Sequence, residues 1–409
     1  MTATTLRCRE CGTLYPAGPI YACERCFGPL EVVYDYEALA AQPLRSVFAS
    51  GPQSIWRYEP LLPVDRIAEI DLQPGWSPLI HAQRLGRALG LRQLYIKNDS
   101  VNPTWSFKDR VVGVAIAAAR RFGFEVVACA STGNLANAVA AHAARAGLRA
   151  CVFIPKGLER GKVVATAAYG PTIVEVEGNY DEVNRLCAEI AEEHRWAFVN
   201  VNLRPYYSEG GKTLGFEVAE QLGWRAPDHV VVPVASGSLL VKIHKGLAEL
   251  HRTGVIPDLR THVHGAQAAG CAPVASAFAE GREEIHPVKP NTIARSLAIG
   301  TPADGRYVLR LARDTGGRVL AVTDEEIVDG IRLLAETEGI FTETAGGVTI
   351  GVLRALAGQG AFAAEDVVVA YVTGIGLKTL EAVETRLTPP ITIKPALREF
   401  ERAVLELVG

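Results

Sequence analysis

The stretch LYIKNDSVNPTWSFKDRVVGVAIAAARRFG, residues 94–123, predicts a β-strand, a loop and an α-helix in succession. Its first residues, LYIKN, are typical of a strand, and apolar side chains recur at helical spacing from SFKDR up to Gly123. Ser106 and Asp109 have the spacing of a capping box, which predicts that Lys108 lies in the first turn of the helix.

The same unit recurs along the chain, and this repetition decides the predicted fold class. One series of predicted strands reads EVVACA, CVFIP, TIVEVEG and AFVNVN, and a second reads HVVVPV, RTHVHGAQ, RVLAVT and DVVVAYVTG. Alternation of strands and helices over this length implies parallel sheets with right-handed crossovers. We therefore expect an α/β protein with two open, mostly parallel sheets and a cleft lined by loops at the carboxyl ends of their strands.

A chain of 409 residues suits two packed α/β domains with a small appendage. We expect a cysteine-bearing module at residues 1–35, a small domain at 126–204 and the end of a C-terminal helix at 401–409. The large domain would combine residues 36–125 with 205–400.

The charge balance disfavours nucleic acid as a partner. The chain has 42 basic and 45 acidic residues, a net charge of −3, so it has no general attraction for nucleic acid or anionic lipid. The N-terminus lacks the apolar segment of a signal peptide, and no uncharged apolar stretch is long enough to span a membrane. The sequence predicts a soluble, cytoplasmic protein without a membrane or nucleic-acid partner.

Four of the eight cysteines are clustered in the first 26 residues with the spacing of two metal-binding knuckles. Cys8 and Cys11 are separated by eleven residues from Cys23 and Cys26, and together the four supply the thiolates of a tetrahedral zinc site. An all-cysteine set has no open position, so a structural zinc in a ribbon-like module is favoured over a catalytic one. The alternative is a module of free thiols without metal.

Several predicted strands end in small polar loops that suit anion binding. STGN at 131–134 and ASGSLL at 235–240 each precede a helix, whose free N–H groups attract a carboxylate or phosphate. NLRPYYSEGGKT at 202–213 adds a forked guanidinium. Taken alone, each loop is explained as well by helix capping or a tight turn, and Lys108 by a solvated surface amine.

Together the motifs resemble the threonine synthases, in order and across nearly the whole chain. The resemblance rests on ECG, CERCFGPLEVVYDY, NPTWSFKDR, ASTGN, ASGSL, FTETAGG and VTGIGLKT. It implies a pyridoxal-phosphate enzyme with the fold of the tryptophan-synthase β type, and a homodimer. The implied reaction converts O-phospho-L-homoserine and water into L-threonine and phosphate.

The resemblance also implies roles for individual residues. Lys108, next to Phe107, would bond the cofactor aldehyde, Asn134 would contact its 3′-oxygen, and Thr373 would meet the pyridine nitrogen. As a neutral partner, Thr373 would leave that nitrogen unprotonated. The cofactor phosphate would be held by Ala235, Ser236, Gly237, Ser238 and Leu239. The substrate carboxylate would be bound by Ser131, Thr132 and Asn134, and the leaving phosphate by Asn202, Arg204 and Lys212.

Three departures from the family pattern leave other reactions open. Trp105 replaces a small residue, ASGSL replaces a loop rich in Gly and Asn, and Ile375 replaces Asn. One alternative keeps the cofactor and changes the reaction to a threonine or serine dehydratase, or to β-replacement on serine derivatives. The other alternative is a zinc-ribbon adaptor that carries an inactive enzyme body.

Overall fold

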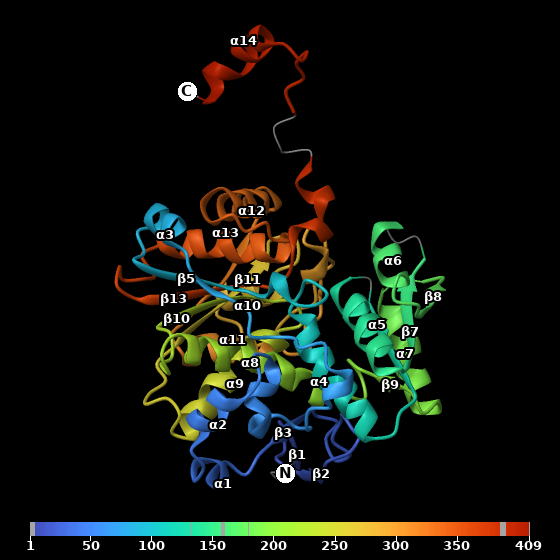
Figure 1. Cartoon of the computed structure of the whole chain (residues 1–409). Coiled ribbons are helices and arrows are strands. Elements are labelled where there is room, and N and C mark those ends of the chain that lie inside the picture. Colours follow the sequence, from blue (N-terminus) through green and yellow to red (C-terminus); the bar gives the residue numbers. More distant parts are fainter. Residues whose placement is uncertain (1–4, 132, 157–159, 179, 385–389, 409) are drawn as a thin grey trace.

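The computed structural model describes residues 5–131, 133–156, 160–178, 180–384 and 390–408. Its strands form three sheets, of three, six and four strands. Figure 1 shows the six-stranded sheet in the middle of the molecule and the four-stranded sheet beside it.

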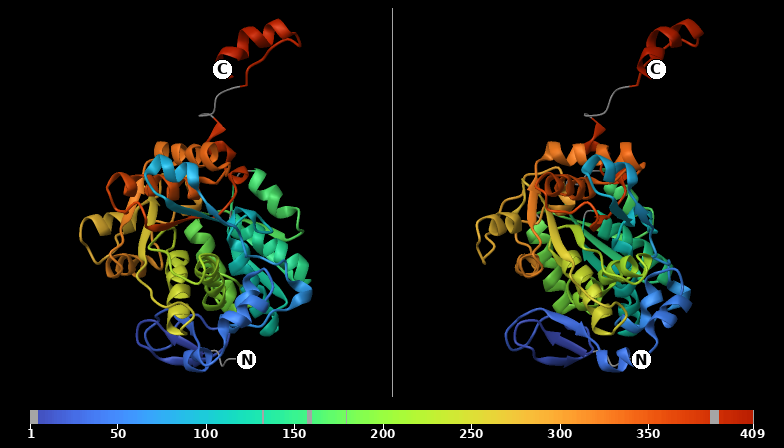
Figure 2. Two further views of the ribbon diagram at one scale, coloured as in Figure 1. Left: turned by 60° about the vertical axis from the view of Figure 1, so that its left-hand side comes forward. Right: turned by 90° about the vertical axis from the view of Figure 1, so that its left-hand side faces the viewer.

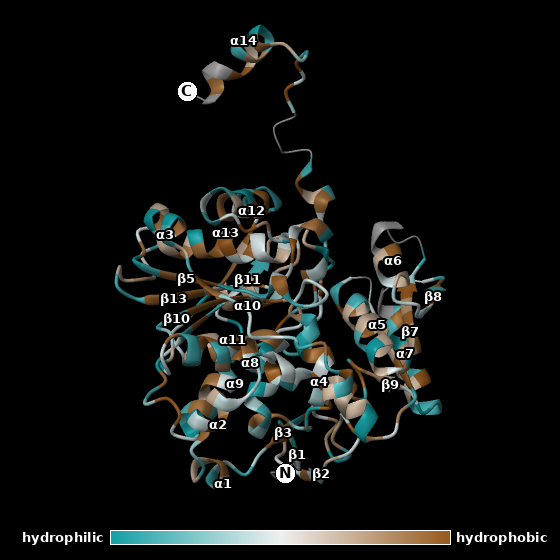
Figure 3. Cartoon of the chain, in the orientation of Figure 1, coloured by the Kyte–Doolittle hydropathy of each residue, from teal (hydrophilic) through white to brown (hydrophobic). Residues whose placement is uncertain are grey.

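The six-stranded sheet is parallel apart from one edge strand. Its order is β12(Val319–Val322), β11(His262–Ala268), β10(His229–Pro233), β13(Val367–Val372), β5(Gln93–Asn98) and β4(Leu79–His81). Only β4 runs antiparallel to its neighbour. Strands β10 and β13 are buried along their whole length, which explains their valine-rich, uniformly apolar sequences (Figure 3).

The four-stranded sheet is parallel throughout. Its order is β8(Thr172–Val176), β7(Arg149–Pro155), β6(Val126–Ala130) and β9(Ala197–Phe198). Strand β9 is shorter than the strand predicted over AFVNVN, because the chain turns after Phe198. The two mostly parallel sheets confirm the predicted α/β fold class, whereas the predicted domain boundaries remain a prediction.

Helices cover both faces of the large sheet and connect it to the small one (Figure 1). One face carries α3(Gln83–Leu89), α12(Asp324–Glu338) and α13(Thr344–Gly358), and the other side holds α8(Arg204–Gln221), α9(Ser238–Arg252), α10(Pro273–Ala279) and α11(Gly305–Asp314). The small sheet packs with α5(Asn134–Ala146), α6(Arg160–Ala167) and α7(Tyr180–Glu193). Helix α4(Lys108–Arg121) contacts both α5 and α8, so it lies where the two sheets meet. The capping box predicted at Thr323 and Glu326 is confirmed at the start of α12.

Glycines allow α8 to pack closely between α4 and α9. A Cβ atom on Gly210 would lie 2.4 Å from the carbonyl oxygen of Arg110, and one on Gly246 would lie 2.4 Å from that of Lys212. Such distances are far inside van der Waals contact, so any larger residue would push the helices apart. The close packing positions the first turn of α8 beside the first turn of α4.

The N-terminal residues form a small antiparallel sheet of β1(Thr5–Cys8), β2(Leu14–Pro16) and β3(Leu30–Val33). Two short helices follow, α1(Tyr36–Ala40) and α2(Leu44–Ser50), and then 3-10 turns at 55–61 and 68–70. Figure 2 shows this part at the end of the body opposite to the C-terminal segment. Strand β3 contacts α8, which joins the N-terminal part to the main body.

The C-terminal helix α14(Leu397–Val408) projects from the body in all views (Figures 1 and 2). Residues 390–408 expose the large apolar side chains of Ile391, Ile393, Leu397, Phe400 and Leu407. Within the described residues, no helix has both the length and the apolar character needed to cross a membrane.

Candidate active site

Lys108 is the first residue of α4 and lies at the carboxyl edge of the large sheet. The backbone N–H of Phe107 donates to the carbonyl of Thr373, directly after β13, at 2.9 Å. The half-buried Lys108 amine donates to the hydroxyl of Tyr207, on α8, at 3.0 Å. It also lies 4.5 Å from the centre of the Phe107 ring. The first turns of two helices therefore hold one amine beside the end of a strand.

The capping box predicted for Ser106 and Asp109 is wrong. The Asp109 carboxylate accepts from the backbone N–H and the hydroxyl of Thr104 at 2.8 and 3.0 Å, and lies 3.1 Å from Nε2 of His142. The Ser106 hydroxyl is buried and has no partner among the described residues. Asp109 thus connects the preceding loop to helix α5. Its spacing suggested a local partner, Ser106, but its partners in the folded chain are Thr104 and His142.

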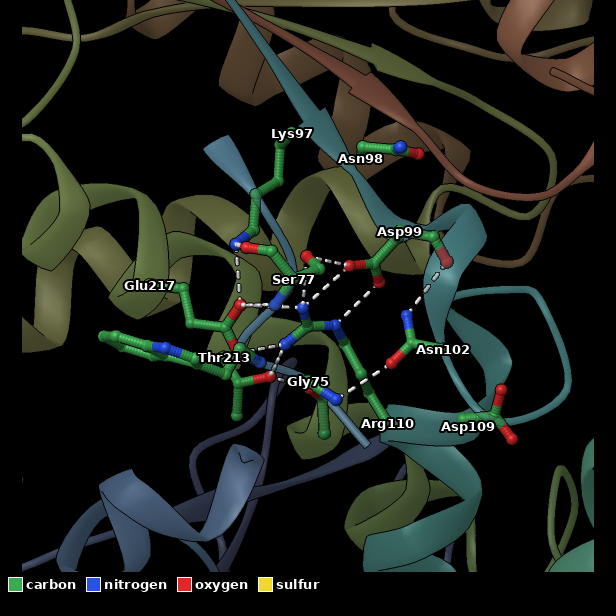
Figure 4. Close-up of polar contacts among 12 residues, drawn as sticks. Gly75, Ser77, Lys97, Asn98, Asp99, Asn102, Asp109, Arg110, Thr213 and Glu217 are labelled. Atoms are coloured by element: carbon green, nitrogen blue, oxygen red, sulfur yellow. Dashed lines mark hydrogen bonds and ion pairs between the residues drawn. The ribbon is translucent and has the colours of Figure 1, made fainter. Parts of the chain in front are cut away.

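Arg110, two residues after Lys108, anchors α4 in a buried network of charges (Figure 4). Its guanidinium binds both carboxylate oxygens of Asp99 at 2.7 Å and contacts Glu217 at 2.8 Å. Lys97 donates to the same Glu217 carboxylate at 2.7 Å. Two cations and two carboxylates balance, and the bidentate contact with Asp99 fixes the orientation of the guanidinium. The network sets the position from which Lys108 projects.

A second group of polar side chains joins both sheets near Lys108. Asn134 begins α5, and its Nδ2 donates to the carboxylate of Glu343, which precedes α13, at 2.9 Å. Thr373 donates its hydroxyl to the same carboxylate at 3.2 Å. The amine of Lys378 donates to the side-chain oxygen of Asn134 at 2.7 Å. These hydrogen bonds join four residues in a continuous row, which we call the ring-edge row: Lys378, Asn134, Glu343 and Thr373.

The electrostatics of the row are set by burial and by mutual pairing. Burial raises the pKa of the Glu343 carboxyl above its usual value, while Asn134, Lys378, Thr373 and Lys108 oppose that rise. Burial lowers the pKa of the Lys378 amine, and the charges of Glu343 and Asp109 oppose that change. The row therefore places one cation and one carboxylate where a polar ligand could contact Asn134 and Thr373.

The loop 235–239 turns sharply from β10 into the N-terminus of α9. Gly237 has φ +97°, and a Cβ there would lie 2.7 Å from Val308 and 3.1 Å from the backbone of Asp304. The backbone N–H of Asp304 donates to the carbonyl of Ser236 at 2.8 Å. The first turn of α9 leaves N–H groups without partners inside the helix, which suits an anion such as phosphate.

Arg204 lies beside this loop, at the start of α8. It shares a cavity with Ser208 and Ser238, and its guanidinium binds the carboxylate of Asp304 at 2.7 Å. Because Arg204 and Tyr207 are three residues apart on α8, they lie on the same side of the helix. The helix connects the loop 235–239 with the Lys108 amine.

Three other residues were predicted to bind the substrate, and their surroundings differ: Ser131, Thr132 and Asn202. Ser131 is half-buried and accepts from the N–H of Gly133 at 3.4 Å, while Thr132 lies outside the described residues. The amide nitrogen of Asn202 donates to the carbonyl of Trp196 at 2.8 Å, and its buried side-chain oxygen has no partner among the described residues.

Lys212 is not at this site, so its prediction as a phosphate ligand is wrong. Its side chain is fully buried, and its amine pairs with Glu209 and Glu249 at 2.7 Å each. The amine also lies 4.1 Å from the centre of the Tyr34 ring, behind β3. Two carboxylates and an aromatic face occupy this amine, which leaves it no access to a ligand at the carboxyl edge of the sheet.

The residues present fit pyridoxal phosphate. The set contains a primary amine for an aldehyde, a free helix N-terminus for a phosphate, and side-chain donors and acceptors at Asn134 and Thr373 for a heterocycle. A Cβ on Gly133, at the start of α5, would meet nothing within 4 Å, so the structure has open space there. Trp105 is half exposed, with φ +58°, and its carbonyl accepts from the N–H of Ile375.

Three residues of the site were missed in the sequence, namely Tyr207, Glu343 and Lys378. Each lies inside a motif that the sequence analysis quotes, yet only its neighbours were selected. Their contacts join positions separated by 99, 209 and 244 residues. No local pattern signals such pairings.

The four N-terminal cysteines form a separate cluster. Their Sγ atoms all lie within 4.8 Å of one another, with Cys8 and Cys26 at 3.4 Å and Cys11 and Cys23 at 3.6 Å. Zinc–sulfur bonds of about 2.3 Å in a tetrahedron separate the sulfurs by about 3.8 Å. The cluster therefore fits a zinc ion.

Comparison with known proteins agrees with this geometry. The family model described as "Pyridoxal-phosphate dependent enzyme" matches residues 70–374. The threonine synthase of Methanocaldococcus jannaschii is 38% identical over 405 residues, covering 98% of this chain and 99% of the relative. That of Methanosarcina acetivorans is 35% identical over 402 residues, with 98% of each chain covered.

Solved structures show the same fold at lower identity. Diaminopropionate ammonia lyase from Escherichia coli has a TM-score of 0.66 at 20% identity, over 85% of this chain and 92% of the other. Threonine deaminase isoform 2 from Solanum lycopersicum has a TM-score of 0.63 at 22% identity, over 85% and 86%. These likenesses support the fold alone. With the family match and the two relatives, the chain belongs to the pyridoxal-phosphate dependent enzymes and, among them, to the threonine synthases.

Proposed function

We propose that this protein converts O-phospho-L-homoserine and water into L-threonine and phosphate. The observation that carries the proposal is the Lys108 amine, held by the hydroxyl of Tyr207 at 3.0 Å beside the Asn134–Glu343–Thr373 contacts. When bound, pyridoxal phosphate supplies the electron sink that makes the substrate Cα–H bond acidic.

The residues of the chain would then transfer protons, orient the cofactor ring and bind its phosphate. Lys108 would hold the cofactor in the resting enzyme and, once free, relay protons: the protons taken from Cα and Cβ would be returned to Cγ, after phosphate has left, and to Cα, after water has added at Cβ. Tyr207 would hold the free amine between these transfers. Phosphate departs from Cγ and water adds at Cβ. Asn134 and Thr373 would orient the ring, and residues 235–239 would bind the cofactor phosphate.

The substrate groups have fewer candidates than the sequence suggested. Ser131 and Asn134 are proposed for the substrate carboxylate, and Arg204 for the leaving phosphate, with Asn202 as a further candidate. Arg204 is supported by its place beside Ser238 and on the same side of α8 as Tyr207. A guanidinium suits a dianion because it donates two parallel hydrogen bonds.

The test is a product balance on purified protein supplied with pyridoxal phosphate and O-phospho-L-homoserine. We expect threonine and phosphate in equal amounts, and no turnover in Lys108→Ala. Phosphate accompanied mainly by 2-oxobutyrate would indicate a dehydratase-like outcome instead. If no phosphate appears although the cofactor is bound at Lys108, the proposed substrate is wrong.

We also propose a structural zinc ion at the four cysteines and a homodimer in the cytoplasm. The zinc proposal is supported by the sulfur distances, and a reducing compartment would keep the four thiols available for metal. The dimer is supported by the exposed apolar side chains of residues 390–408, since such patches often mark interfaces. Light scattering on the full chain tests the dimer, and metal analysis tests the zinc.

A further inference from the structure

Lys378 lies in the short 3-10 turn that follows β13, and its side chain joins two other elements of the site. Its Nζ donates to the backbone carbonyl of Thr104 at 2.5 Å and to Oδ1 of Asn134 at 2.7 Å. Thr104 belongs to the loop before α4, and Asn134 is the first residue of α5. One half-buried amine therefore connects the loop that leads to Lys108 with a helix of the small sheet.

Both contacts of this amine are independent of its charge and of the charge of Glu343. A lysine amine has at least two hydrogens even when it is neutral, and the carbonyl of Thr104 can only accept. The oxygen of Asn134 faces the amine, so its Nδ2 faces Glu343, where it donates at 2.9 Å. A carboxyl group has an oxygen that accepts this bond whether it is ionised or neutral. The amide of Asn134 is thus held at both ends.

The backbone that carries Lys378 is itself fixed to neighbouring elements. The N–H of Gly376 donates to the carbonyl of Phe341 at 2.9 Å, and a Cβ on Gly376 would lie 2.6 Å from the Phe341 ring. The N–H of Ile375 donates to the carbonyl of Trp105 at 3.2 Å. The turn is therefore packed against the segment before α13 and the loop before α4, so the Lys378 side chain projects from a defined position.

Helix α5 has a second contact with the same region, but that contact lies far from Asn134. Nε2 of His142 lies 3.1 Å from the carboxylate of Asp109, on α4. His142 is eight residues after Asn134, which is about 12 Å along a helix. The contact at His142 holds the later turns of α5, whereas the place of its first residue depends on Lys378 and Glu343.

We propose that Lys378 is a positioning residue that sets the place of Asn134 relative to the Lys108 amine. This inference rests on the proposed function and deepens it. The bound cofactor would have to meet Lys108 and Asn134 at the same time, although α4 follows a strand of the large sheet and α5 follows one of the small sheet. Groups that act together on one ligand must be held within about 0.5 Å of their productive positions. Lys378 supplies that link between the two sheets.

Lys378→Met keeps most of the side-chain volume and removes both donors. Because the oxygen of Asn134 would lose its partner, we expect the apoenzyme to bind pyridoxal phosphate roughly tenfold more weakly. Lys378→Arg keeps donors at this place and should restore most of the affinity. Lys289→Met, at an exposed position, is the control and should match the wild type. A fluorescence titration of the apoenzyme measures each affinity.

A double-mutant cycle decides whether Lys378 acts through Asn134. Asn134→Ala removes the amide that Lys378 holds, so adding Lys378→Met to it should weaken cofactor binding no further. Independent effects would instead multiply, and that result would overturn the proposal. If Lys378→Met does not fold, Lys378→Gln, whose side chain is one atom shorter, takes its place in the cycle.

Visible circular dichroism of the holoenzyme measures the orientation of the bound ring, which a purely structural role of Lys378 would not change. We expect Lys378→Met and Asn134→Ala to lose ellipticity per bound cofactor, and Lys378→Arg to regain it. An unchanged band in Lys378→Met, with the cofactor bound, would overturn the role of Lys378. Borohydride reduction and peptide mass analysis of the wild type test the proposed function separately, which itself fails if Lys108 does not acquire the cofactor.

Discussion

At the scale of single residues, the Lys108 amine has one hydrogen-bond partner within the described part of the chain, the hydroxyl of Tyr207. Tyr207→Phe removes that acceptor and keeps the ring. We expect kcat to fall roughly tenfold with little change in KM, since a lost hydrogen bond to a charged group costs about 1.5 kcal/mol or more. The measurement is steady-state threonine formation across pH.

Tyr206→Phe is the matched control for that variant. The Tyr206 hydroxyl contacts the backbone of Gly18 at 2.9 and 3.0 Å, whereas Lys108 donates to Tyr207, so kcat should be retained in Tyr206→Phe. Equal kcat values and pH profiles for both variants and the wild type would leave Tyr207 with a packing role only.

At the scale of elements, removing one charge from the buried network that anchors α4 should lower the free energy of unfolding (Figure 4). Among the described residues, Glu217→Gln leaves Arg110 and Lys97 with only Asp99 as a charged partner in a fully buried site. We expect a loss of about 3–5 kcal/mol, because breaking a buried pair leaves an uncompensated charge. Urea unfolding measures it. Glu365→Gln removes an exposed pair with Arg92 and should change stability by less than about 0.5 kcal/mol.

The same carboxylate predicts an acid dependence of stability. Burial opposes its ionisation, but Arg110 and Lys97 together lower the pKa of Glu217 to about 2. A group with a depressed pKa in the folded state stabilises the fold above its usual pKa of about 4.5. That contribution, about 3 kcal/mol, should be lost as the pH falls from about 4.5 to 2. The stability gap between wild type and Glu217→Gln should therefore shrink over this interval, and a constant gap would contradict the assignment.

At the scale of the whole molecule, the cysteine cluster is joined to the active site through Arg9. This residue lies between Cys8 and Cys11, binds the carboxylate of Asp304 at 3.0 Å and stacks over Tyr307. Asp304 in turn contacts Arg204 and the backbone of Ser236. Arg9→Ala would leave the negative charge of Asp304 less neutralised beside the loop 235–239, which is proposed to bind the cofactor phosphate. We expect roughly tenfold weaker binding of pyridoxal phosphate, equivalent to about 1.4 kcal/mol.

Arg7→Ala is the control for Arg9→Ala, since Arg7 lies on the same small sheet but pairs with Glu31, whereas Arg9 pairs with Asp304. A fluorescence titration of the apoenzyme with pyridoxal phosphate measures both affinities. If Arg9→Ala and Arg7→Ala bind the cofactor equally, the module serves folding and does not support the loop. Zinc removal by a chelator should reproduce the Arg9→Ala effect.

The sequence by itself determined the features that depend on neighbours along the chain. Strand and helix periodicity predicted the two mostly parallel sheets, and the Cys-x2-Cys spacing predicted a cluster that the structure assembles. The Thr323 capping box, a purely local motif, is also present. Local hydrogen bonds and side-chain periodicity follow from the order of residues, so they can be inferred without the fold.

Only the tertiary structure decided which distant groups became partners. Asp109 contacts Thr104 and His142 instead of its predicted partner Ser106. Lys212, predicted as a phosphate ligand, forms buried ion pairs with Glu209 and Glu249. Tyr207, Glu343 and Lys378 reach the site because α8, α13 and the segment after β13 meet α4 and α5 at the carboxyl edges of two sheets. The physical reason is that burial obliges each charged or polar side chain to find a partner among whatever elements pack around it, and sequence spacing carries no record of that packing.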